Sequence, residues 1–308
     1  MRSPPRSFCT LVVVRSSDTQ DQEGRRCNLD GMNFIGHVLI DGQRVNPHLA
    51  TISVFDIALL RGFGCFETLR SYNGTAFRQG EHLDRLERSA ASLGLELPPR
   101  EKMERWVADR AALGDCTVRV VATGGTAERA TGEGARFIVF AEPLSRIDDT
   151  VSLLPVEAPW HPDGAVSELT GAKTLSYGPT VAARIHAKAE GFGDALLVGR
   201  SGNVLEGPTN TVAWIYHGVL ETPELGLGIL ASVTRKAVLE VARELGIPIK
   251  EGRFRLERML AADEVMALST LRELQPVVKI GEVDKEVGPL TKKLMGGLQE
   301  LIAAETAD

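Results

Sequence analysis

Apolar residues recur along this chain in two patterns, as short runs bounded by turn residues and as stripes at helical spacing. The run over residues 34–40 meets Asp41-Gly42, a dipeptide that adopts the positive φ angles of a tight hairpin, and Asn73-Gly74 repeats this signal. We expect further strands over residues 117–122, 136–141, 194–198, 212–216, 219–222 and 264–269. We expect helices around residues 83–93, 180–191, 232–245 and 290–302.

The pattern stops and restarts in the middle of the chain. Residues 143–164 carry four prolines and mixed polarity, which indicates a connection between two domains. Strands joined by hairpins, with helices grouped around them in two halves, predict an α+β fold with domains over 32–150 and 151–308. Residues 123–134 are polar and rich in glycine, so we expect a mobile loop there.

Residues 1–31 have a different composition from the rest. Arg2, Arg6 and Arg15 lie among serines, and no acidic residue precedes Asp18, a composition typical of an organelle transit peptide. The alternative is a disordered leader or an upstream start, with Met32 as the native first residue. The expected location is the cytoplasm, or a plastid or mitochondrion if the segment is a targeting peptide.

Composition narrows the class of protein. The 308 residues include 35 Lys and Arg against 41 Asp and Glu, a formal net charge of −6, which excludes a generally basic nucleic-acid binder. With 43% hydrophobic and 25% charged residues the chain matches an ordinary globular protein. Its apolar runs are far shorter than the roughly 20 residues needed to cross a bilayer. The four cysteines and six histidines are scattered, so we expect no metal site.

Two segments carry candidate chemistry. Lys173 lies in a run of small and uncharged residues, and burial there would favour a neutral amine able to form a Schiff base, whereas the alternative is a surface lysine in a loop. The second segment, 226–231, matches the loose dinucleotide pattern G-x-G-x-x-A and opens a helix at Ser232. That match is weak, because Pro223-Glu224 interrupts the strand that the pattern requires.

Several motifs in combination resemble the class IV, or fold type IV, pyridoxal-phosphate enzymes. This family includes branched-chain aminotransferases, D-amino-acid aminotransferases, aminodeoxychorismate lyases and (R)-amine transaminases. The resemblance runs from about Phe34 to the C-terminus. It rests on Gly64-Cys65-Phe66-Glu67, Glu81-His82-x-x-Arg85-Leu86, Lys173 with Tyr177, Glu206-Gly207 followed by Asn210, Val233-Thr234-Arg235, and Ser269-Thr270.

The resemblance implies pyridoxal 5'-phosphate as cofactor and a role for each matching residue. Lys173 would bind the cofactor covalently and act as the catalytic acid and base. Glu206 would keep the pyridine nitrogen protonated, and Tyr177 would hydrogen-bond the phenolic oxygen, although some family members place this tyrosine elsewhere. Arg85 would pair with the phosphate, because a guanidinium matches two phosphate oxygens. Val233, Thr234 and Thr270 would complete the phosphate site.

Substrate residues are less uniquely indicated. The candidates are Phe66, Thr68, Arg70, Arg119, Arg129, Leu271 and Arg272. D-amino-acid aminotransferases usually carry Thr-Arg-Gly where this chain has Thr123-Gly124-Gly125, which weakens that alternative. Branched-chain enzymes usually show Tyr-x-Arg, of which Thr117-Val118-Arg119 keeps only the arginine. Thr68, two residues after the phenylalanine, is a feature of the lyases.

The sequence therefore predicts an aminotransferase that moves an amino group from an amino acid, with branched-chain L-amino acids favoured, to a 2-oxo acid such as 2-oxoglutarate. The alternatives are a lyase that releases pyruvate and 4-aminobenzoate from aminodeoxychorismate, and a D-amino-acid or (R)-amine transaminase. The resemblance also implies a homodimer. Cys65 is expected to be a small buried residue.

Overall fold

A computed structural model describes residues 27–29, 32–126, 134–164 and 167–307 of the chain. Most of the proposed leader, most of the predicted loop over 123–134, and Arg129 lie outside these residues. Residues 27–29 of the segment assigned to the leader pair with the first long strand. Among the described residues, no helix is long and apolar enough to cross a membrane.

The N-terminal half is built on an antiparallel sheet in the order β1-β2-β7-β6-β4-β5, with β3 on β2. Both predicted hairpins form, because Asp41 and Asn73 adopt positive φ angles ahead of a glycine. The strands are β1 (Cys27–Leu29), β2 (Met32–Ile40), β3 (Gln43–Val45), β4 (Gly64–Tyr72), β5 (Thr75–Ala76), β6 (Cys116–Thr123) and β7 (Phe137–Pro143).

Two helices cover one face of this sheet, and a core of aliphatic side chains fills the space between them. The helices of this half are η1 (Pro47–Leu49), α1 (Ile57–Arg61), α2 (Gln79–Leu93) and α3 (Arg100–Ala111). Helix α2 presents the predicted stripe, with Leu83 and Leu86 fully buried. The sequence did not predict α3, because only Met103, Val107 and Ala111 carry its apolar face among many charges.

The C-terminal half holds a mixed sheet in the order β12-β11-β10-β13-β14-β8-β9, with β15 on β14. Its strands are β8 (Val151–Glu157), β9 (Asp194–Val198), β10 (Thr211–Tyr216), β11 (Val219–Pro223), β12 (Ile249–Gly252), β13 (Glu264–Ser269), β14 (Glu273–Ile280) and β15 (Val283–Asp284). The predicted connection over 143–164 is wrong in its second part, where β8 pairs with β14 and β9 despite Pro155. The chain crosses between the sheets within residues 144–150.

Helices pack on the C-terminal sheet: α4 (Gly178–Ala189), η2 (Leu225–Leu227), α5 (Val233–Glu244), α6 (Leu256–Leu260) and α7 (Pro289–Glu305). The stripe of α5 and the leucines of α7 share one core. Helix α5 joins the parallel strands β11 and β12. Pro223 is the last residue of β11, so the expectation that it interrupts the strand before the helix is wrong. The N-terminus of α5 therefore lies beyond the carboxyl end of β11.

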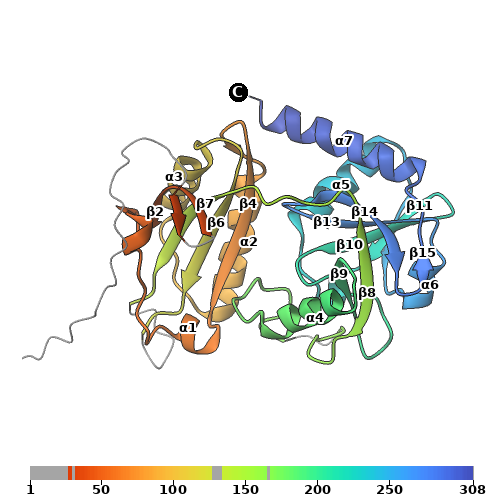
Figure 1. The fold of residues 1–308 in the computed structure, drawn as a ribbon, viewed down its shortest axis with the longest axis horizontal. Coiled ribbons are helices and arrows are strands. Elements are labelled where there is room, and N and C mark those ends of the chain that lie inside the picture. The colour runs from red at the N-terminus through yellow and green to blue at the C-terminus, as the bar shows by residue number, and fades with distance from the viewer. Residues whose placement is uncertain (1–26, 30–31, 127–133, 165–166, 308) are drawn as a thin grey trace, which may run out of the picture.

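The two halves lie side by side, with α2 of the first toward α5 and α7 of the second (Figure 1). Arg78 precedes α2. It donates to Glu240 of α5 at 2.5 Å and to Glu305 of α7 at 2.8 Å. Phe77 belongs to the core under α5 and α7. The contacts between the halves are therefore both apolar and ionic, and they hold α2 close to the start of α5.

Candidate active site

The backbone around Lys173 adds a short bridge to the edge of β4. The amide of Phe66 donates to the carbonyl of Lys173 at 3.1 Å, and the amide of Leu175 donates to the carbonyl of Gly64 at 2.9 Å. On the other side, the amide of Lys173 donates to Oγ of Ser89 in α2 at 3.0 Å. A segment of the C-terminal half is thus anchored to both layers of the N-terminal half, which fixes where the lysine side chain begins.

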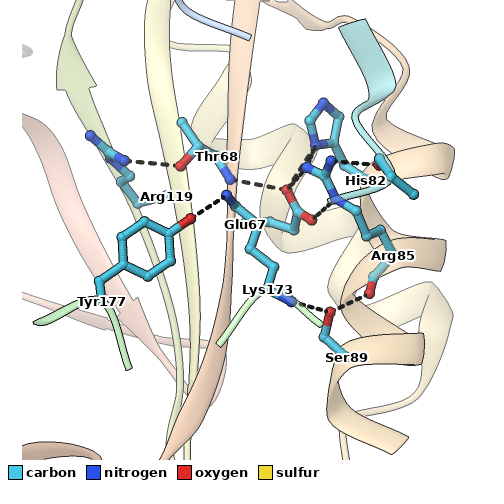
Figure 2. Close-up of polar contacts among 9 residues, drawn as sticks. Glu67, Thr68, His82, Arg85, Ser89, Arg119, Lys173 and Tyr177 are labelled. Atoms are coloured by element: carbon cyan, nitrogen blue, oxygen red, sulfur yellow. Dashed lines mark hydrogen bonds and ion pairs between the residues drawn. The ribbon is translucent and has the colours of Figure 1, made fainter. Parts of the chain in front are cut away.

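The amine of Lys173 lies beside two aromatic rings, those of Phe66 and Tyr177, and Figure 2 shows the second of them. Nζ is 4.4 Å from the centroid of the Phe66 ring and 3.4 Å from the hydroxyl of Tyr177. Burial lowers the pKa of Lys173 to about 8, although the charges of Glu67 and Glu206 act in the opposite direction. A large fraction of this amine is therefore neutral near pH 8, as a nucleophile or a base requires. The surface-lysine alternative is not what the structure shows, because the residue is partly buried.

The carboxylate of Glu67 organises the region beside the lysine. The sequence indicated this residue only as part of a family motif, without a role of its own. Glu67 is fully buried, and it accepts from Nε of Arg85 at 2.6 Å and from Nη2 of Arg85 at 2.8 Å. Nδ1 of His82 lies 2.9 Å from the same carboxylate. Alternation along β4 could have shown that Glu67 points away from Phe66 and toward α2. It could not have shown which groups of α2 it meets.

Arg85 also reaches the C-terminal half. Its Nη1 donates to the carbonyl of Ala231 at 2.9 Å, just before the N-terminus of α5. Ser232 caps that helix through the amide of Arg235, and Val233 and Thr234 form its first turn, whose N–H groups have no acceptor within the helix. The sequence prediction placed Arg85, Val233 and Thr234 in one phosphate site. The structure places the arginine beside the helix start.

Thr234 and Thr270 line one small cavity together with His82. Thr270 lies in the turn between β13 and β14, far from α5 in sequence but brought to it by the sheet. The hydroxyl-bearing residues predicted for the phosphate therefore share a space with a neighbour of Arg85.

Glu206 stands at another side of Lys173. Its Oε2 accepts from the amide of Leu230 at 3.1 Å, and its Oε1 lies 3.8 Å from Nε2 of His161. His161 was not predicted. Its Nδ1 accepts from the amide of Asp163 at 3.2 Å, so the neutral ring carries its proton on Nε2, toward the carboxylate. Glu206 contributes charge to the surroundings of Lys173, Tyr177 and Arg85 alike, which places all four groups in one site.

Among the substrate candidates, Phe66 lies against the lysine amine, and Figure 2 shows Thr68 and Arg119 near it. Thr68 and Arg119 face each other across β4 and β6, and Nη1 of Arg119 donates to Oγ1 of Thr68 at 2.9 Å. The Nε of Arg119 donates to Glu142 at 2.8 Å, and its side chain keeps 34% exposure. Arg119 is therefore paired with Glu142 but partly exposed, and its positive charge helps to lower the pKa of Lys173.

The remaining candidates form a second group between the halves. Arg70 pairs with Glu273 at 2.7 Å, and its Nη1 donates to the carbonyl of Leu271 at 3.3 Å. Arg272 donates to the buried Asp194 at 2.6 Å and to Gln275. All of these residues except Asp194 line a cavity of about 530 Å³ under the connection 144–150. The charge of Arg272 is therefore already paired, which the sequence did not predict.

Sequence comparison identifies the family. The family model for class IV amino-transferases matches residues 64–280. A putative branched-chain-amino-acid aminotransferase of Methanocaldococcus jannaschii is 34% identical over 271 residues, which cover 83% of this chain and 93% of the relative. A bifunctional aminodeoxychorismate lyase and D-amino acid transaminase of Mycobacterium tuberculosis is 33% identical over 232 residues, with 68% and 78% covered.

Solved structures share the fold. The branched-chain aminotransferase of Thermoproteus uzoniensis with norvaline superposes with a TM-score of 0.80 at 28% identity, over 88% of this chain and 95% of that one. The PLP-bound form of a hypothetical aminotransferase from Mycobacterium tuberculosis gives 0.81 at 26% identity, over 88% and 100%. The fold is thus the α+β fold type IV. The chain belongs to the class IV aminotransferases and is a pyridoxal-phosphate-dependent transaminase.

The residues present fit this cofactor. A partly buried amine with a pKa of about 8 has as charged neighbours a carboxylate, Glu206, and a cation beside a helix N-terminus, Arg85 with α5. An aldehyde needs such an amine, a pyridinium nitrogen needs the carboxylate, and a phosphate needs the cation and the free N–H groups. The described residues contain no group of three or more His, Cys, Asp and Glu side chains that could hold a metal ion.

Proposed function

We propose that this aminotransferase takes the amino group from a branched-chain-like L-amino acid and passes it to a 2-oxo acid such as 2-oxoglutarate, with Lys173 as the catalytic residue. The observation that carries the proposal is the position of the Lys173 amine, in contact with Phe66 and Tyr177 and close to the partly exposed Arg119. The names of the archaeal relative and of the norvaline-containing structure support the choice of substrate.

Each residue has a physical role in this proposal. Glu206 would hold a proton on the pyridine nitrogen, and Arg85, Val233, Thr234 and Thr270 would bind the phosphate. Tyr177 would donate to the phenolic oxygen, since burial and nearby carboxylates raise its pKa and keep it protonated. When bound, the cofactor supplies an electron sink that makes the substrate Cα proton acidic. Nζ of Lys173, neutral in large part near pH 8, would accept that proton.

Arg119 is our candidate for the substrate carboxylate, with Thr68 holding its guanidinium in place. Replacing Arg119 by Ala should raise KM for the 2-oxo acid about 10- to 100-fold, because a charged hydrogen bond contributes about 1.5–3 kcal/mol. Arg136→Ala is the matched control, since that arginine forms an exposed ion pair with Asp41 at one end of β7. Equal KM values for both variants would assign the carboxylate to another group, with Arg70 and Arg272 next.

The visible spectrum of the purified holoenzyme tests the substrate proposal. Addition of L-leucine alone should bleach the cofactor band, and 2-oxoglutarate should restore it. Thr68 and the bifunctional relative favour a second candidate, aminodeoxychorismate lyase activity. Release of pyruvate from aminodeoxychorismate without any 2-oxo acid would establish that alternative. Bleaching by D-alanine and not by L-leucine would indicate a D-amino-acid transaminase.

We also propose that two copies of the chain pair through an apolar surface formed by η1, the segment before α1, α1 itself and α4. Leu49 and Phe55 are 70% and 71% exposed, and Leu59, Leu60 and Ile185 are similarly open. Such a set of large exposed apolar side chains is typical of a protein interface. Sedimentation should give the mass of a dimer, and Phe55→Glu with Leu59→Glu should give a monomer. A monomeric parent protein would contradict this proposal.

A further inference from the structure

The most completely enclosed ionic group in the described part of the N-terminal half lies on the far side of β4 from Phe66. The side chain of Glu67 has no exposure, that of His82 has 1% and that of Arg85 has 6%. Figure 2 shows the Glu67 carboxylate facing Arg85 and His82 of α2, and the backbone of Lys173 in contact with Ser89 of the same helix. These groups are linked through hydrogen bonds to the backbone that carries the catalytic lysine.

The protonation states follow from the contacts. Burial alone would raise the pKa of Glu67, but the charge and hydrogen bonds of Arg85, with the hydrogen bond from His82, hold it well below its usual range. Burial lowers the pKa of His82, so the ring is neutral. An ionised carboxylate only accepts, so Nδ1 of His82 carries the hydrogen and donates to Glu67.

Glu67 holds Arg85 by two parallel contacts, through Nε and Nη2, which we call the fork. The fork determines which N–H groups Arg85 can still donate to a ligand. A guanidinium has five N–H groups. Glu67 takes one from Nε and one from Nη2, and Ala231 takes one from Nη1. Nη2 also lies 3.4 Å from Nδ1 of His82, but that nitrogen carries a hydrogen and cannot accept. One N–H of Nη1 and one of Nη2 are therefore left for a further acceptor. Because Glu67 and Ala231 fix the plane of the group, those two remaining donors have a set direction before any ligand arrives.

We propose that Glu67, assisted by His82, is a positioning residue for the cofactor phosphate: it orients Arg85 at the start of α5 so that its two free N–H groups serve the phosphate. This inference rests on the proposed role of Arg85. The gain in affinity for the phosphate comes from preorganisation, because an arginine that is already held in place loses little conformational freedom when the phosphate binds. Arg85 would be the ligand, and Glu67 would act only through it.

If Glu67 acted only through its charge, its removal would change the affinity for phosphate in the opposite direction. Removal of an anion next to a phosphate site should tighten phosphate binding. Orientation predicts weaker binding for Glu67→Gln, because the glutamine amide would place an NH₂ donor against one N–H of the fork and break it. The direction of the change therefore separates the two effects.

The test compares the apparent dissociation constants of pyridoxal phosphate and of pyridoxal, which lacks the phosphate, with refolded or native apo-protein of each variant. For Glu67→Gln we expect the affinity for pyridoxal phosphate to fall about tenfold or more. A loss of this size is typical in metal sites when a residue that orients a metal ligand is replaced. The affinity for pyridoxal should change less than about twofold. Equal losses for both compounds, or tighter binding of the phosphate form, overturn the inference.

Glu221→Gln is the matched control, because Glu221 holds Arg258 in the same two-point fork, at 2.8 and 2.7 Å, outside the site. It should leave both affinities unchanged. Arg85→Met should selectively lower the affinity for pyridoxal phosphate. If the double variant Arg85→Met with Glu67→Gln loses no more affinity than Arg85→Met alone, Glu67 acts through Arg85. Additive losses in the double variant overturn the inference. If Arg85→Met weakens both compounds equally, the proposed phosphate role of Arg85 fails independently of the inference.

Two milder variants keep the test usable if Glu67→Gln does not fold. Glu67→Asp retains the buried charge but is one methylene shorter, so it cannot keep both contacts with Arg85. His82→Leu removes one donor to Glu67 and leaves the fork. We expect a selective loss for pyridoxal phosphate in both, larger for Glu67→Asp. Unchanged selectivity in both variants would overturn the inference.

Discussion

Two regions of this molecule contain nearly the same set of chemical groups. In each, a buried glutamate holds an arginine by Nε and Nη2, Glu67 with Arg85 and Glu221 with Arg258. Each also has a lysine over a phenylalanine ring, Lys173 over Phe66 at 4.4 Å and Lys250 over Phe254 at 5.5 Å. In the second region Lys250 faces Glu221 across β11 and β12.

The two regions differ in how far water is excluded. Arg258 keeps 35% side-chain exposure and lies over the ring of Tyr216, whereas Arg85 keeps 6%. Lys250 is exposed, and Lys173 is partly buried with a pKa of about 8. Identical residue types therefore form an ion pair with a partly exposed arginine in one place and a reactive site in the other. Burial between two domains, and not residue identity, produces the difference.

The largest expected contrast concerns the two lysines. Lys173→Ala should lower the transamination rate at least about 10²- to 10⁴-fold, the range of general acid–base catalysis, because no other amine replaces Nζ. Lys250→Ala should leave the rate unchanged. Steady-state assays with one amino donor and one 2-oxo acid measure both. A Lys173→Ala variant with full turnover would remove the distinction between the regions.

The next contrast is in stability. Glu67→Gln should reduce the free energy of unfolding of the apo-protein by about 3–5 kcal/mol, because it leaves the buried Arg85 without its counter-charge. Glu221→Gln should cost much less, since water can solvate Arg258. Urea unfolding followed by circular dichroism compares the two. Equal losses would mean that the difference in exposure of the arginines has no energetic weight.

The smallest expected effect is a shift in pH dependence. Burial lowers the pKa of Lys173 to about 8, and the negative charge of Glu67 partly opposes this. Glu67→Gln should therefore lower the pKa further, so that the neutral amine is more abundant at pH 7. The rate at which a small aldehyde modifies Lys173 in the apo-protein, followed by mass spectrometry, should reach its plateau at lower pH. Glu221→Gln should not move the profile, and an upward shift in Glu67→Gln would contradict the proximity of Glu67.

Several features were readable from the sequence. The Asn73-Gly74 turn and the stripe of α5 ending before Gly246 depend on neighbouring residues only, so local patterns predict them. Helix α3 and strand β8 were missed, because their local patterns are weak and tertiary packing compensates. Pro155 is tolerated within β8 because it pairs with β9 only, beyond Leu153, the last residue of β8 that pairs with β14.

The site was readable only in part. The small residues around Lys173 and the family motifs indicated the lysine, Glu206 and Arg85 as chemistry-bearing groups. They did not indicate that Asp194 compensates Arg272, a partner 78 positions away, or that His161 faces Glu206. No local pattern records such pairs, because the residues meet only after strands from different parts of the chain have been placed side by side.

The sequence alone determined the fold class, most strands and helices, and the residue types available for chemistry, because backbone propensity and apolar periodicity act over a few residues. Only the tertiary structure decided which of the two carboxylate–arginine pairs is shielded from water. That choice depends on how much water the packing of α2, β4 and α5 excludes, and desolvation is a property of the assembled layers rather than of any residue in them.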